Sequence, residues 1–213
     1  MPTTRSYGDA CGMARALDVV GERWAVLVVR ELTLGPRRFS DLRRSLPNAS
    51  SNLLSDRLRE LRQHGVLERR RLAPPAASWV YELTELGRRL EPILIELGKW
   101  GLSFPPPEPS GLSATSVLLY LRSHIRPQPG MDPVTVGVEL DDQLWTVRVT
   151  AAKAVVTAGE PARCDVSVHS DPASFDAVLH RPSLLRKAIA GGRVKVSGNL
   201  ALLGAVLDRL PAD

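Results

Sequence analysis

The side chains able to act as nucleophiles, bases or metal ligands are few and widely separated in this 213-residue sequence. Cys11 and Cys164 are too far apart in sequence to predict a disulfide framework or a metal-ligand cluster. His124, His169 and His180 have no metal-binding spacing, and none belongs to a recognisable nucleophile–base motif. No phosphate-binding loop is visible either. The sequence therefore predicts a protein that is not an enzyme and has no metal or cofactor.

The cellular compartment is predicted from the apolar segments and the cysteine content of the sequence. No apolar run is long enough to cross a bilayer, and the N-terminal stretch MPTTRSYGDACGM lacks the apolar segment of a secretion signal. With only two cysteines, we expect a reduced cytoplasmic protein with no membrane partner.

Arginine is the residue type that does cluster. The net charge of +5 resides entirely in residues 1–104, because residues 105–213 hold 11 basic and 11 acidic side chains. Residues 37–71 contain ten arginines and only four acidic residues. A GC-rich genome would raise the total of 24 arginines, but it does not explain why they cluster. The cluster indicates a nucleic-acid-binding surface.

The elements that carry these arginines follow a recognisable order. A first helix is predicted over 13–24 and should end or bend near Gly21, and a second helix is predicted over 22–35. A short third helix has Ser40 as its N-cap and should end before Pro47. A fourth helix, 51–64, is capped by Ser50 or Ser51 and ends at Gly65. Two strands within 66–84 form a hairpin with a long tip, and Thr84 caps a last helix that Pro92 should kink. This order is that of a winged helix-turn-helix.

In that geometry the helix 51–64 enters the major groove of double-stranded DNA, and the hairpin 66–84 is the wing that reaches the flanking backbone. Leu54, Leu58 and Leu61 share the inner face of the helix, opposite its polar residues. Asp56 either pairs with Arg57 or Arg59, or accepts from a cytosine amino group. The residues predicted to contact DNA are Arg37, Arg38, Ser50, Ser51, Asn52, Ser55, Arg57, Arg59, Arg62, Arg69, Arg70 and Arg71.

Four stretches of residues 8–101 form a pattern that is specific to one family: ALDVVGERWAVLVVREL, GPRRFSDLRRSLPNAS, LLSDRLRELRQHGVLERR and YELTELGRRLEPILIELGKWG. With these stretches, residues 8–101 resemble the HxlR family of bacterial winged-helix transcriptional regulators. This resemblance implies a homodimer on palindromic operator DNA, with residues 11–20 and 86–100 forming the dimer seam. Many family members carry a cysteine at the position of Cys11, so Cys11 is a candidate redox sensor; the alternative is a packed or idle thiol.

The second half begins after a proline-rich linker. We place the domain boundaries at 1–104, 105–111 and 112–213, because SFPPPEPSG has no helical or strand period. Strands and helices follow, and the stretch AIAGGRVKVSGNLALLGAVLDRL resembles the sterol-carrier-protein-2-like domain. That resemblance implies a layered α/β fold with an apolar cavity between sheet and helices. Trp145 and Phe175 are candidate cavity residues, the alternative being ordinary core packing, and Cys164 is predicted in the core.

The expected fold class is thus α+β, a winged helix-turn-helix domain followed by a layered sterol-carrier-like domain. We interpret the chain as a dimeric DNA-binding regulator whose second domain either binds an apolar small-molecule effector that controls it or helps to hold the dimer. The alternative is a lipid-binding or apolar-ligand-binding protein that uses the winged helix only for dimerisation.

Overall fold

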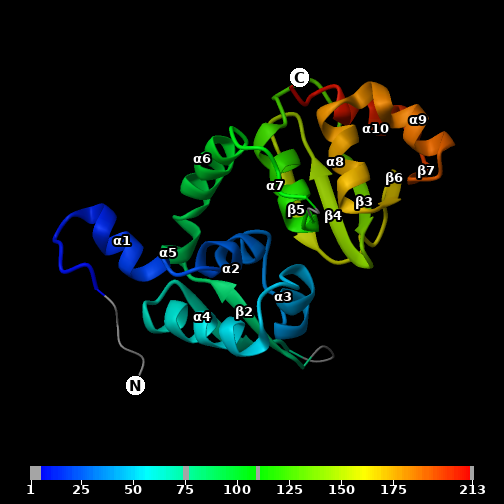
Figure 1. Cartoon of the computed structure of the whole chain (residues 1–213). Coiled ribbons are helices and arrows are strands. Elements are labelled where there is room, and N and C mark those ends of the chain that lie inside the picture. Colours follow the sequence, from blue (N-terminus) through cyan, green and yellow to red (C-terminus); the bar gives the residue numbers. More distant parts are fainter. Residues whose placement is uncertain (1–5, 74–76, 109–110, 212–213) are drawn as a thin grey trace. The chain divides into compact units, whose positions relative to one another are not determined.

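A computed structural model describes residues 6–73, 77–108 and 111–211 (Figure 1). The chain separates into two compact units, Met1–Pro105 and Pro106–Asp213. Within the described ranges, no helix combines the length and the apolarity needed to cross a bilayer. The first unit contains α1 (Gly12–Val20), α2 (Ala25–Leu32), α3 (Phe39–Ser45), α4 (Ser51–Gln63), β1 (Leu67–Arg71), β2 (Trp79–Leu83), α5 (Glu85–Arg88) and α6 (Glu91–Gly101).

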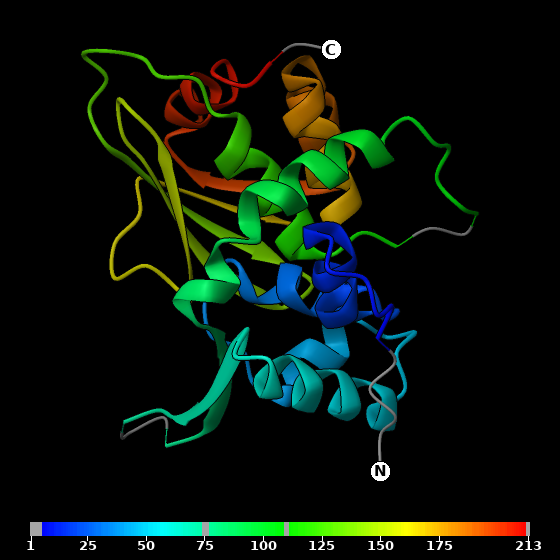
Figure 2. The ribbon, with the colours of Figure 1, turned by 90° about the vertical axis from the view of Figure 1, so that its left-hand side faces the viewer.

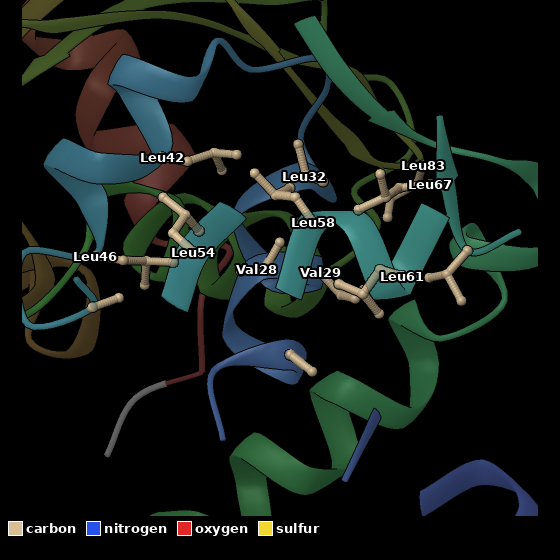
Figure 3. Packing of buried hydrophobic residues seen from close by; sticks show 13 residues of the cluster. Val28, Val29, Leu32, Leu42, Leu46, Leu54, Leu58, Leu61, Leu67 and Leu83 are labelled. Carbon is tan, nitrogen blue, oxygen red and sulfur yellow. The ribbon is translucent and has the colours of Figure 1, made fainter. Parts of the chain in front are cut away.

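The core of the first unit forms around the apolar face of α4. Leu54, Leu58 and Leu61 are at most 1% exposed, as their spacing predicts. Figure 3 shows these three side chains among those of α2, α3 and the hairpin. Because burying one leucine side chain contributes about 1.5–3 kcal/mol, this face fixes which side of α4 remains outside.

Three helix boundaries differ from the predicted ones. The second helix begins only at Ala25, because Trp24 has a φ of 79° and cannot continue a helix from Glu22. The N-cap of α3 is Arg38 rather than Ser40. Thr84 does cap the next helix, accepting from the N–H of Gly87 at 3.1 Å, but that helix ends after one turn and α6 starts separately.

The hairpin is a two-stranded antiparallel sheet that extends away from the helices of its unit (Figure 2). Leu67 pairs with Leu83 at its base and Arg71 pairs with Trp79 near its tip. Arg37 adds an isolated bridge to β2: its N–H donates to the carbonyl of Tyr81 at 2.9 Å, and the Tyr81 N–H donates to the carbonyl of Arg37 at 2.8 Å. This bridge ties the start of α3 to the wing.

The second unit is a five-stranded mixed sheet with helices packed on it. The strand order is β5-β4-β3-β6-β7, in which β3 and β6 are parallel and the other neighbours are antiparallel. Its elements are α7 (Ala114–His124), β3 (Val134–Leu140), β4 (Gln143–Val149), β5 (Ala154–Ala158), β6 (Val166–Ser170), α8 (Pro172–His180), the 3₁₀ turn η1 (Pro182–Leu184), α9 (Leu185–Ala190), β7 (Val194–Gly198) and α10 (Leu200–Leu207).

The interior of the second unit is built from buried apolar side chains. Val134, Val136 and Val138 alternate with outward-facing residues along β3, as the sequence predicts. Trp145 and Phe175 are 0% and 1% exposed, which supports core packing, the alternative considered for them above. Cys164 was predicted in the core and this is wrong: it precedes the first residue of β6, in the loop, and it is exposed.

Both units have the predicted architectures. The first has the helix–helix–helix–hairpin order of a winged helix-turn-helix, and the second is a sheet layered with helices. The α+β class is therefore confirmed.

Candidate nucleic-acid interface

The N-terminal turn of α4 presents short polar side chains to solvent. Ser50 caps the helix by accepting from the N–H of Leu53 at 3.2 Å. Ser51, Asn52 and Ser55 are exposed, and the first turn carries no acidic residue. The partial positive charge of a helix N-terminus therefore faces outward with side chains that both donate and accept hydrogen bonds. This end of the helix is suited to approach phosphates and base edges.

The three arginines of α4 differ in how they are held. Arg57 was predicted to contact DNA, but its side chain is only 11% exposed and pairs with Glu60 at 2.7 Å and Glu22 at 3.5 Å. We correct that prediction, because Arg57 ties α4 to the α1–α2 turn. Arg59 is exposed and pairs with Asp56, one of the alternatives considered above. Arg62 is exposed and has no ion pair among the described residues.

The arginines at and near α3 also include both buried and exposed side chains. The side chain of Arg37 was expected on the DNA-facing surface, but the residue is 7% exposed, and burial lowers the pKa of its guanidinium while nearby Glu31 opposes the shift. Arg38 is exposed at the N-cap, where its N–H donates to the carboxylate of Asp41 at 3.1 Å. Arg44 is also exposed, and we did not include it among the predicted contacts.

The wing carries its arginines on both faces. Arg69 and Arg71 share one face with Tyr81 and Trp79, and the guanidinium of Arg69 lies 4.6 Å from the centre of the Trp79 ring. Arg70 points to the other face and donates to Glu82 at 2.8 Å. This hydrogen bond raises the pKa of Arg70 and lowers that of Glu82. Stacking on Trp79 leaves the charge of Arg69 free to meet a phosphate, whereas Arg70 has to leave Glu82 to do so.

Exposed cations thus occur on three consecutive elements of the first unit. They extend from the start of α3 through the exposed side of α4 to the hairpin. The sequence predicted this order, but it did not predict the Arg69–Trp79 stack. Cross-strand neighbours depend on the register of the hairpin, and the long tip between the strands left the register open.

A second surface of the first unit is apolar. No residue of α1 or α6 is buried within the chain. Met13 on α1 is 73% exposed, and Ile93 and Trp100 on α6 are 59% and 64% exposed. Cys11, the N-cap of α1, is exposed as well, and the backbone N–H groups of Ala14 and then Met13 lower the pKa of its thiol.

The second unit has a hollow of about 410 Å³ on the sheet face away from the packed interior. Outward-facing residues of β3, β6 and β7, including Glu139, His169 and Lys195, line it, and Cys164 lies at its rim from the adjoining loop. Trp145 also borders it. Among the described residues, no group of three histidine, cysteine or acidic side chains is placed to hold a metal ion.

Comparison with known proteins decides the family of the first unit. Residues 19–109 match the HxlR-like helix-turn-helix family. The chain is 39% identical over 93 residues to the uncharacterized HTH-type transcriptional regulator YvaP of Bacillus subtilis, covering 44% of this chain and 86% of that protein. The chain belongs to the HxlR-like family. This confirms the resemblance described from the sequence.

Two further HxlR-like relatives from the same organism show the same extent of similarity. YkvN is 39% identical over 92 residues, covering 43% of this chain and 78% of that protein. YodB is 34% identical over 95 residues, covering 45% of this chain and 85% of that protein. YkvN is an uncharacterized HTH-type transcriptional regulator and YodB is an HTH-type transcriptional regulator. Regulators of this class are not enzymes, in agreement with the prediction.

The second unit of this HxlR-like protein matches a different protein family from the first. Residues 134–207 match the SCP-2 sterol transfer family. The predicted fusion of a winged helix with a sterol-carrier-like domain is therefore confirmed. The protein is an HxlR-type transcriptional regulator with an added SCP-2-like unit.

Proposed function

We propose that this HxlR-type regulator binds palindromic operator DNA as a homodimer, with α4 in the major groove and the hairpin on the flanking backbone. The observation that carries the proposal is the division of α4 into a buried leucine face and an exposed polar end, flanked on both sides by exposed arginines. A two-fold axis would set the two copies of α4 about one turn of DNA apart.

The exposed apolar residues of α1, α5 and α6 support the dimer. Leu17, Leu86 and Leu97 are between 42% and 51% exposed, in addition to the more exposed residues described above. Apolar groups of this size on several adjacent elements usually mark a protein interface. We infer that residues 11–20 and 86–100 form the seam between two copies.

The proposed contacts separate into two kinds. The contacts to base edges come from the exposed part of α4, namely Ser51, Asn52, Ser55 and Arg59. Arg59 must first leave its ion pair with Asp56. The remaining exposed arginines and Ser50 bind phosphates, which supply affinity without sequence choice. They are Arg38, Arg62, Arg69, Arg70 and Arg71.

Binding is tested by fluorescence anisotropy with duplexes tiled across the DNA upstream of the protein's own coding sequence. We expect one duplex to bind tightly, with an affinity that falls steeply as salt rises. Asn52→Ala should weaken binding to that duplex by about 1–3 kcal/mol and leave other duplexes unchanged, whereas Arg70→Ala should weaken binding to all of them. Equal effects of the two substitutions on every duplex would contradict the proposed docking.

We further propose that an apolar ligand of the SCP-2-like unit controls DNA binding. Support comes from the match of residues 134–207 to the SCP-2 sterol transfer family. Such a ligand regulates only if it binds one arrangement of the dimer more tightly than another, and residues 86–104 are the segment through which we expect that preference to act. A long-chain fatty acid is the probe: it should bind the full chain and change the DNA affinity. An affinity for DNA that stays unchanged at saturating fatty acid would contradict the proposed coupling.

A further inference from the structure

The SCP-2-like unit carries a basic surface of its own. Its eleven lysines and arginines balance eleven acidic residues, yet five of the eleven lie between positions 181 and 195, and no acidic residue occurs between 177 and 207. We define the α9–β7 patch as these five residues, all of them exposed: Arg181, Arg186, Lys187, Arg193 and Lys195.

The members of this patch lie around one edge of the sheet, where Lys195 points to the face that carries the hollow and the neighbouring Val194 points to the packed interior. α9 packs against β7, which is an edge strand of the sheet, and a turn with Gly192 at a φ of 69° joins them. The N–H of Arg193 donates to the carbonyl of Ala188 at 3.0 Å. This bond closes the turn and places Arg193 at the C-terminal end of α9, beside Lys187.

The charges of the patch are not neutralised locally. Among the described residues, none of its five members forms an ion pair. Two nearby acidic residues have partners outside the patch: Glu139 lies 3.1 Å from His169, and Asp171 caps α8 by accepting from the N–H of Ser174. Glu139 and Glu160 do line the same hollow as Lys195, so the cations farthest from acidic side chains are those of α9 and Arg193. An edge-strand lysine such as Lys195 has an ordinary role in preventing sheet-to-sheet pairing, but the cations of α9 have no such role.

We propose that the α9–β7 patch binds the phosphate backbone of DNA next to the site held by the winged helix. This inference rests on the proposed function, since the winged helix must already hold the chain on DNA. The first unit ends in a turn in which the N–H of Phe104 donates to the carbonyl of Gly101, and the second begins with α7 at Ala114. A fully extended proline-rich chain spans about 3.1 Å per residue, so the upper limit for the connection between Phe104 and Ala114 is on the order of 25–30 Å. That limit corresponds to roughly eight base pairs, so flanking phosphates are present at high effective concentration.

The patch favours DNA over an anionic membrane. A helix that binds in a lipid interface exposes apolar residues beside its cations. The apolar residues Leu185 and Ala188 of α9 are buried instead, and no large apolar residue is exposed between positions 181 and 195. The surface therefore offers charge alone, as phosphate-backbone contacts require.

The test compares two full-length variants with the same change in net charge. The patch variant carries Arg186→Gln, Lys187→Gln, Arg193→Gln and Lys195→Gln. The control carries Arg126→Gln, Arg148→Gln, Lys153→Gln and Arg163→Gln, which alter exposed cations elsewhere in the same unit. Binding to a duplex of about 60 base pairs, long enough for a dimer and both flanks, is measured between about 50 and 200 mM salt. Circular dichroism verifies that both variants fold.

We expect the slope of log affinity against log salt to become shallower by about 2–4 in the patch variant and to stay near the parent value in the control. Equal slopes in the two variants would overturn the inference while leaving the proposed function intact. Unchanged DNA binding together with lost binding to phosphatidylserine vesicles would overturn it in favour of a membrane. A parent chain that binds no duplex at low salt would instead overturn the proposed function, and this inference with it.

Discussion

Individual arginines in the first unit differ in exposure and in the partners of their side chains, although they are the same residue type. Arg37 is buried beneath the wing, and Arg57 is held by two glutamates. Arg62 is exposed without an ion pair among the described residues, while Arg69 is stacked on Trp79. Only the cations that remain exposed can exchange counterions for DNA phosphates. The useful DNA-binding charge is therefore smaller than the count of arginines suggests.

The contrast between Arg62 and Arg57 gives a prediction about two substitutions on one helix. Arg62→Ala should reduce the salt slope of DNA binding by about 1 and leave stability unchanged, because it removes a solvated phosphate contact. Arg57→Ala should instead lower the free energy of unfolding by about 1 kcal/mol or more, because it leaves Glu60 and Glu22 without their partner. Urea unfolding and anisotropy separate the two effects; the reverse pattern would contradict these roles.

The two cysteines should also behave differently. Cys11 is exposed at the N-terminus of α1, where backbone N–H groups lower the pKa of its thiol, so it should form a thiolate at lower pH than an ordinary cysteine. Alkylation by iodoacetamide, followed by mass spectrometry between about pH 6 and 9, should label Cys11 in the Cys164→Ser variant faster than Cys164 in the Cys11→Ser variant. The difference should be largest at the acidic end. Equal rates there would remove the basis for a sensing role of Cys11, which stays a prediction.

At the scale of elements, short contacts between backbones decide how the wing is attached. Thr84 caps α5 and also donates to the carbonyl of Gly65 at 2.6 Å. A Cβ atom on Gly87 would lie 2.0 Å from the carbonyl oxygen of Val66. The first turn of α5 therefore packs directly on the chain that enters β1, and only glycine permits this approach.

Gly87→Ala is accordingly expected to destabilise the first unit by about 3 kcal/mol, because the clash is with backbone that cannot rotate away. Gly204→Ala in α10 is the matched control. It meets nothing within 4 Å and should stabilise by about 0.5–1 kcal/mol through helix propensity. Thermal unfolding of the full chain measures both. A Gly87→Ala variant as stable as the parent would show that α5 does not pack on the wing in this way.

At the scale of the whole molecule, α1 and α6 present apolar side chains that the described residues of the first unit leave exposed. None of their residues is buried, although Leu90 and Leu94 pack partly on the core of the first unit. A second copy of the chain would cover the exposed residues, and dimerisation would also position two copies of α4. Assembly and DNA recognition are thus expected to depend on each other.

Ile93→Glu combined with Leu97→Glu should convert the proposed dimer to a monomer, because two charges would be buried at the seam. Sedimentation equilibrium should show the change, and operator affinity should fall by more than tenfold because one half-site is lost. Leu144→Glu is the control, since it alters an exposed leucine of the second unit. A double variant that remains dimeric would place the interface elsewhere.

Much of the candidate site followed from the sequence. Leucines at three- and four-residue spacing fixed the buried face of α4, and Ser50 marked its start, so the exposed residues Asn52 and Ser55 could be assigned. The sequence did not show which arginines are buried or paired with glutamates in the folded chain. Glu22 and Arg57 are separated by 35 positions and meet only because α1 and α4 pack together. Arg37 is buried, and its backbone pairs with that of Tyr81, 44 positions further along the chain.

By itself, the sequence determined the order of the elements, the two families and the location of the positive charge, because periodicity, caps and composition are local properties. The tertiary structure alone decided which cations stay exposed, that Cys164 lies at the surface, and that the cations of α9 and β7 adjoin. Each of these depends on which distant segments pack against each other. Packing depends on the whole chain, and no single stretch of sequence contains it.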